Sequence, residues 1–254
     1  MQLLMEYHDS VWKQSRKKLK EYLVYQEQDS LHDFRKSIRQ LNTLFNLFHF
    51  VDAGFQSESY LRRTNKMYEH AGELRDEFVS QSLAKKYGFA LQINEELKLI
   101  QFEKLKRHYI GNNSHNSNAK QKGRMLLAEI TSEDLKRFSH FVVSNLTTEI
   151  ANAENFRDVH QIRKDIKQYL LLNKFLELEK IETAKSADLD FLDSLQNSIG
   201  NKHDIEKFLR KIGDRKLTEK METTITKIEK DEKKINNEIS VALKTWSKKH
   251  EHES

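Results

Sequence analysis

The chain has 254 residues, of which 37% are hydrophobic and 33% charged, and its formal net charge is +5. The absence of Cys excludes disulfides, thiol nucleophiles and thiolate metal sites. The chain also lacks Pro, has only seven Gly, and shows no clear strand-like alternation, so it is predicted to be all-α. It has no apolar run of about 18 residues and no basic-then-apolar leader, so we expect a soluble, cytoplasmic protein with no membrane partner.

The first half of the chain shows helical periodicity in several long segments. We expect a chain break at 86–89 and a polar loop at 111–118, which is rich in turn-forming residues. The predicted helices span about 3–26, 30–50, 57–82, 92–109 and 119–129.

The second half is predicted to hold a similar number of helices. Gly200 is expected to end one of them, because Gly commonly follows the last helical residue. The residues after about 215 are predicted to form one long helix, or two separated by a kink. The predicted helices span about 132–153, 158–182, 187–200, 203–212 and 215–250.

The segment 30–39 is repeated 128 positions later, without a gap, as 158–167. His, Arg, Lys and Ile recur at the same offsets. The same shift carries Gly72 onto Gly200 and Asp76 onto Asp204. The sequence therefore predicts an internal duplication, with repeats at about 1–129 and 130–254 packed as one unit.

Each copy of the repeated segment is predicted to form an amphipathic helix. At about 100° per residue, its apolar residues share one face and its basic residues share the other. Ser30 with Asp33, and Asp158 with Gln161, match the capping-box pattern, which would place each His in the first helical turn. The basic faces carry His32, Arg35, Lys36 and Arg39 in the first copy, and His160, Arg163, Lys164 and Lys167 in the second.

A duplication packed about a pseudo-twofold axis would bring these two basic faces to a shared groove. Such a groove needs an anionic ligand or neighbouring carboxylates to offset its charge. Arg suits phosphate because its planar guanidinium is permanently charged and can bind two oxygens at once.

The order of these motifs resembles the CHAD domain, the conserved histidine α-helical domain. The first half has His-x-x-Arg-x-x-x-Arg followed by Gly-x-x-Arg-Asp, and the second has His-x-x-Arg-x-x-x-Lys followed by Gly-x-x-x-Asp. The resemblance covers nearly the whole chain. It implies a helical, pseudo-symmetric, non-catalytic protein that binds inorganic polyphosphate, without a cofactor, through basic residues of a central cavity. It also implies an association with polyphosphate granules and with enzymes that make or degrade polyphosphate.

The resemblance implies polyphosphate-binding roles for specific residues, with Lys36 and Lys164 added where the family more often has an aliphatic residue. Asp76 and Asp204 are interpreted as carboxylates that orient a neighbouring Arg or His. The chain departs from the family at Gln40, Asn42, Gln168 and Leu170, where further basic residues are usual. The implied binding residues are His32, Arg35, Arg39 and Arg75 in the first repeat, and His160, Arg163 and Lys167 in the second.

One non-functional interpretation and two other functions also fit parts of the pattern. A repeated basic stripe is often only solvated surface, and a basic groove also attracts nucleic acid, which makes a nucleic-acid-binding protein the main alternative. A metal-dependent phosphohydrolase is a weaker alternative, because no second metal-ligand pair accompanies His32 or His160. The sequence shows no phosphate-cradling Gly loop and no catalytic triad, so no catalytic or metal-binding residue is predicted.

Overall fold

The computed structural model describes residues 1–254 except 90–93, 112, 152–158, 182–188, 214–218 and 251–254. The described residues form nine α-helices and no strand, which confirms the all-α prediction. No helix in these described ranges is both long and apolar enough to cross a membrane. The helices are α1 Gln2–Tyr25, α2 Gln28–Val51, α3 Ser57–Tyr87, α4 Glu95–Ile110, α5 Asn113–Glu129, α6 Ser132–Ala151, α7 Val159–Leu178, α8 Leu189–Gly213 and α9 Glu219–His250.

The helices divide into two compact units that do not follow the two halves of the sequence. Helices α3, α6 and α7 each contribute residues to both units. Unit 1 therefore contains residues from both predicted repeats. Unit 1 comprises Met1–Phe78, Gln92–Phe138 and Leu171–Thr183, and unit 2 comprises Val79–Leu91, Ser139–Leu170 and Ala184–Ser254.

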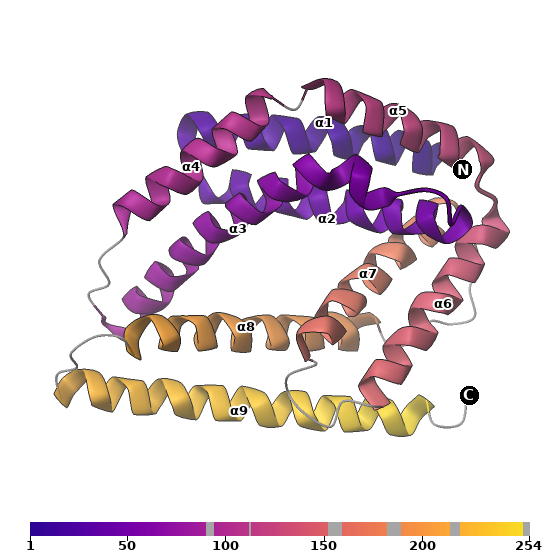
Figure 1. Ribbon diagram of the computed structural model, residues 1–254. Helices are drawn as coiled ribbons and strands as arrows, with labels where there is room; N and C mark the ends of the chain where they lie inside the picture. Colours follow the sequence, from indigo (N-terminus) through magenta and orange to yellow (C-terminus); the bar gives the residue numbers. More distant parts are fainter. Residues whose placement is uncertain (90–93, 112, 152–158, 182–188, 214–218, 251–254) are drawn as a thin grey trace. The chain divides into compact units, whose positions relative to one another are not determined.

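In unit 1, α1 and α2 pack against each other as an antiparallel pair, and α4 and α5 follow one another along α1 (Figure 1). Tyr22 of α1 meets Phe102 of α4 edge-on, with ring centroids 6.2 Å apart. Tyr7 of α1 makes a similar contact with Phe175 of α7, at 5.3 Å. The end of α7 is thus part of the unit built on the first helix.

The apolar face of α2 forms the centre of unit 1, as its sequence periodicity predicts. Burying one such side chain contributes roughly 1.5–3 kcal/mol to stability, so this face is a major reason why α2 is helical here. The residues with no more than 1% exposure are Leu31, Phe34, Ile38, Leu41, Leu44, Phe45, Leu47 and Phe48.

In unit 2, α8 and α9 lie side by side and run antiparallel (Figure 1). Ile205, Phe208 and Ile212 of α8 pack with Ile228 of α9, and the end of α3 adds Ala84. The residues after about 215 are predicted to form a long helix. Their described part, Glu219–His250, is one long helix, which confirms this prediction.

The helix starts only partly follow the predicted caps. A capping box is present at the start of α6. Thr131 Oγ1 accepts from the Asp134 amide at 3.2 Å, and Asp134 Oδ2 accepts from the Thr131 amide at 3.0 Å. The Thr131 hydroxyl also donates to Asp134 Oδ2 at 2.6 Å, and this hydrogen bond, followed by that from the Thr131 amide, lowers the pKa of Asp134.

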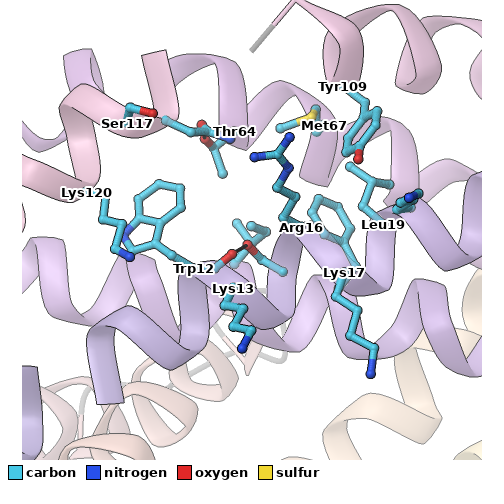
Figure 2. A pocket seen from close by; sticks show the side chains of 15 residues that line it. Trp12, Lys13, Arg16, Lys17, Leu19, Thr64, Met67, Tyr109, Ser117 and Lys120 are labelled. Atoms are coloured by element: carbon cyan, nitrogen blue, oxygen red, sulfur yellow. Dashed lines mark hydrogen bonds between the residues drawn. The ribbon is translucent and has the colours of Figure 1, made fainter. Parts of the chain in front are cut away.

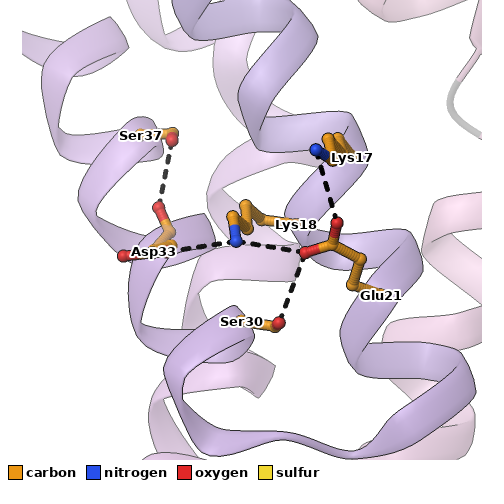
Figure 3. Close-up of polar contacts among 6 residues, drawn as sticks. All are labelled: Lys17, Lys18, Glu21, Ser30, Asp33 and Ser37. Atoms are coloured by element: carbon orange, nitrogen blue, oxygen red, sulfur yellow. Dashed lines mark hydrogen bonds and ion pairs between the residues drawn. The ribbon is translucent and has the colours of Figure 1, made fainter.

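The capping box predicted for the first repeat helix is wrong. Helix α2 begins earlier, at Gln28, so His32 lies in its second turn and not in the first. Ser30 and Asp33 instead contact α1: the Ser30 hydroxyl donates to Glu21 at 3.4 Å, and Asp33 pairs with Lys18 at 3.4 Å (Figure 3). Tertiary contacts have replaced the local cap. Asp158, of the second predicted box, lies outside the described residues.

Two predicted interruptions also differ from the structure. Helix α5 begins at Asn113, inside the predicted loop, because Ala119 and Gly123 are buried in the packing of α5 and that packing outweighs weak helix propensity. Gly200 lies inside α8, which continues to Gly213. The break after Tyr87 is confirmed, with Gly88 at φ 74°, a left-handed conformation that favours glycine.

His8 of α1 is fully buried in unit 1 and is neutral at pH 7. Its Nε2 accepts a hydrogen bond from Trp12 Nε1 at 2.9 Å. A Cβ at Gly123 of α5 would lie 2.7 Å from this nitrogen, so only glycine lets α5 approach so closely. Burial lowers the pKa of His8 from 6.5 to about 4; neighbouring Asp9 opposes the shift, and Lys120 and Arg124 add to it.

We predict that His8 makes the protein acid-sensitive. In the unfolded chain His8 is protonated below about pH 6.5, whereas in the folded chain it is protonated only below about pH 4. The free energy of unfolding should therefore fall by about 3 kcal/mol as the pH falls through this window. Urea unfolding at a series of pH values measures this loss. The His8→Gln variant, whose amide can still accept from Trp12, should lose this part of the slope; equal slopes would contradict the prediction.

Candidate functional site

The structure gathers the predicted basic residues of the first repeat at the contact between α2 and α3, within unit 1. We call His32, Arg35, Lys36, Arg39 and Arg75 the first cationic cluster. Lys36 is exposed and the other four are half-buried. In the described chain, no carboxylate forms an ion pair with Lys36, Arg39 or Arg75. This part of unit 1 therefore carries excess positive charge.

Arg35 is the most constrained member of the first cationic cluster. Its Nη1 donates to the Tyr68 carbonyl of α3 at 2.6 Å, and its Cζ lies 4.1 Å from the centre of the Tyr68 ring. This stacking is a cation–π contact. Burial lowers the pKa of Arg35, and the negative charge of Asp76 acts in the opposite direction. Arg35 thus joins two helices, and the role predicted for Asp76 remains a prediction.

Gly72 is what allows Arg35 to reach this position. A Cβ on Gly72 would lie 2.5 Å from Arg35 Nη1 and 3.4 Å from its Cζ. The Gly of the predicted motif therefore has a steric role: it leaves room for the guanidinium against the backbone of α3.

The same contact occurs in unit 2, between α7 and α8. A Cβ on Gly200 would collide with Arg163 Nη2 and lie 2.9 Å from Arg163 Cζ. Arg35 precedes Gly72 by the same number of residues as Arg163 precedes Gly200. The two Arg–Gly contacts therefore share one sequence spacing and one kind of close approach. The contact with Arg163 also explains why Gly200 lies inside a helix.

The second cationic cluster contains a residue that the motif did not identify as a partner. His203 of α8 lies against His160 of α7, with ring centroids 5.3 Å apart. The repeat offset supplied a signal, because it places His203 on Arg75. We define this cluster as His160, Arg163, Lys164 and Lys167 of α7 with His203 and Lys207 of α8. Asp204, the second predicted supporting carboxylate, is half-buried on α8.

Burial and neighbouring cations lower the pKa of both repeated histidines, His32 and His160. The pKa of His32 is lowered first by burial, then by the charges of Arg75 and Arg39, although Asp33 opposes this. The pKa of His160 is lowered first by burial, then by Lys164 and His203. Both histidines are therefore mainly neutral at pH 7 in the absence of a bound anion.

Gln40 and Asn42 stand at positions where the CHAD domain usually has basic residues, and in this structure they contribute to packing within unit 1. Gln40 forms a hydrogen bond with the hydroxyl of Tyr7, whose pKa burial raises to about 12. Asn42 Nδ2 donates to Asn65 Oδ1 of α3 at 3.1 Å. These two polar side chains join α2 to α1 and α3. In the second repeat, Gln168 and Leu170 are half-buried on α7.

Among the described residues, no group of three or more His, Asp or Glu side chains is arranged to hold a metal ion. The chemistry of both clusters is that of cationic donors. Arg, Lys and protonated His offer N–H groups to an acceptor-only anion. No family model, curated protein or solved structure was found to match this chain.

We predict that Gly72→Ala lowers the free energy of unfolding by about 1 kcal/mol. The new methyl group should push Arg35 off the Tyr68 carbonyl, a charged hydrogen bond contributing about 1.5–3 kcal/mol, while Ala improves helix propensity by about 1 kcal/mol. Urea unfolding measures the difference. In an Arg35→Leu background the guanidinium is gone, so the same substitution should change sign and stabilise the protein. A matched control is Gly111→Ala, where the nearest atom to the new Cβ is 3.6 Å away. Equal effects of Gly72→Ala in both backgrounds would contradict the proposed contact.

Proposed function

We propose that this chain binds inorganic polyphosphate through the two cationic clusters and does not catalyse its turnover. The observation that carries the proposal is the repeated arrangement itself. Each unit places an Arg–Gly contact beside a His and several further cations, and the cations lower the pKa of that His. A bound polyanion would relieve this repulsion in both units.

The ligand chemistry follows from the donors. Internal phosphate units of polyphosphate each carry one negative charge, and their oxygens only accept hydrogen bonds. Arg39 and Arg75 can each offer a guanidinium fork to two oxygens, and Lys36 adds an exposed point charge. The resemblance to the CHAD domain supports the same ligand.

The described carboxylates near the first cationic cluster do little to offset these three cations. Asp33 lies on the same helix, but it pairs with Lys18 of α1. Asp76 acts on the buried guanidinium of Arg35. The outer cations of the cluster, Lys36, Arg39 and Arg75, therefore remain as the proposed ligand contacts, while Arg35 holds the helices that carry them.

We expect the triple variant Lys36→Glu, Arg39→Glu, Lys164→Glu to weaken binding of long-chain polyphosphate at least about tenfold. Each lost charged hydrogen bond is worth about 1.5–3 kcal/mol, and tenfold in affinity corresponds to about 1.4 kcal/mol. Isothermal titration calorimetry at physiological salt measures the change. Arg35 and Arg163 are left intact because they pack against glycine inside the units.

A matched control for charge is Lys104→Glu, Lys227→Glu, Lys230→Glu, which reverses three exposed lysines of α4 and α9. It should bind like the wild type, because only the overall charge changes. If both triple variants lost the same affinity for polyphosphate, binding would depend only on net charge, and the proposed site would be wrong. A second competition, with duplex DNA and RNA at equal phosphate concentration, addresses the nucleic-acid alternative: displacement of polyphosphate by either one would overturn the proposal.

We also expect polyphosphate affinity to rise as the pH falls from 7.5 to 5.5. Burial and neighbouring cations lower the pKa values of His32 and His160 without ligand, and a bound anion favours their protonated forms, so binding should take up protons. Internal phosphate units do not titrate here, so the change belongs to the protein. Binding measured across this range should lose most of its pH dependence in His32→Gln, His160→Gln, with circular dichroism confirming the fold at each pH. An unchanged pH profile in the variant would remove the histidines from the site.

A further inference from the structure

Unit 1 contains a pocket that the cationic clusters do not include. Its volume is about 520 Å³, within the range of small-molecule sites. Helices α1 to α5 all contribute to its lining, and its apolar wall includes the buried side chains of Trp12, Leu19, Phe34, Ile38 and Met67. Figure 2 shows Arg16 extending from α1 between Trp12 and Tyr109, toward Met67.

The charge of this pocket is one-sided. Five of its lining residues are Lys or Arg, and no Asp or Glu is among them. Lys120 pairs with Asp9 at 3.2 Å, and Lys17 pairs with Glu21 at 3.7 Å. In the part of the chain that the structure describes, Arg16 forms no ion pair. Arg16 is also exposed, so its charge is accessible to a ligand.

The pocket is separate from the first cationic cluster. Phe34 and Ile38 line it from the apolar face of α2, whereas Lys36 and Arg39 lie on the opposite face of that helix. A ligand here would therefore contact a different surface from the polyphosphate proposed above.

The lining also combines two aromatic side chains with short polar ones. Trp12 and Tyr109 present ring systems, and Ser117 is an exposed residue of the lining. Thr64 Oγ1 donates to Asn116 Oδ1 at 3.1 Å, which leaves the amide nitrogen of Asn116 as a donor for a ligand. Aromatic faces stack on planar rings, and amides and hydroxyls hydrogen-bond to the edges of such rings.

From these features we infer that the pocket binds an organic phosphate with a planar aromatic ring, of the size of a nucleotide. The ring would lie against Trp12 and Tyr109, and Arg16 would hold the phosphate. A purely apolar ligand would leave Arg16 without an anion, and bare phosphate would leave the apolar wall uncovered. The volume, the one-sided charge and the two aromatic side chains in the lining together favour a ligand with both parts.

The test is calorimetric titration of the full chain with ATP, adenosine, tripolyphosphate and dodecanoate. We expect ATP to bind at one site per chain, and to bind more tightly than adenosine or tripolyphosphate. Arg16→Gln should weaken ATP at least about tenfold, the effect of one charged hydrogen bond. Ser117→Phe, at an exposed position, should block the pocket without disturbing the core. The matched control is Arg62→Gln on α3, an exposed Arg outside the pocket.

Four outcomes would overturn the inference. Tripolyphosphate binding as tightly as ATP would show that no ring is recognised, and dodecanoate displacing ATP would show that the site takes acyl chains. ATP binding unaffected by Arg16→Gln and Ser117→Phe would place the ligand elsewhere. The absence of ATP binding would leave no such site. The two sites can be distinguished, because Arg16→Gln should retain polyphosphate binding, and Lys36→Glu, Arg39→Glu, Lys164→Glu should retain ATP binding.

Discussion

The structure depends on a close contact that occurs twice: an arginine of one helix lies against a glycine of a later helix. A half-buried guanidinium is costly unless its donors are satisfied. At Arg35 the Tyr68 carbonyl and the Tyr68 ring meet this requirement, and Gly72 leaves the space. Arg163 and Gly200 repeat the contact in unit 2.

The basic residues of the first cationic cluster have two different roles: one holds helices together, and the others are available to a ligand. Arg35 is committed to holding α2 and α3 together, so a ligand would mainly meet the outer residues Lys36, Arg39 and Arg75. Two polar residues of α2 also serve packing, since Gln40 and Asn42 join this helix to α1 and α3. A site of this kind keeps its charge concentrated because rigid packing, and not ion pairing, holds its cations close together.

The sequence predicted the class of fold, most of the helices and the members of the first cationic cluster, because these depend on helical period and repeat spacing. It failed where a distant contact overrode a local signal. Ser30 and Asp33 look like a cap but bind α1, and Gly200 looks like a helix end but accommodates Arg163. The pocket beside Arg16 was also missed, because its lining comes from five helices whose packing no local pattern reveals.

The contact of Tyr7 with Phe175 shows that unit 1 is completed by a segment distant in sequence, Leu171–Thr183. A cut between the two halves of the chain would remove this segment from the surface that packs against α1. Neither half of the sequence therefore accounts for a whole unit.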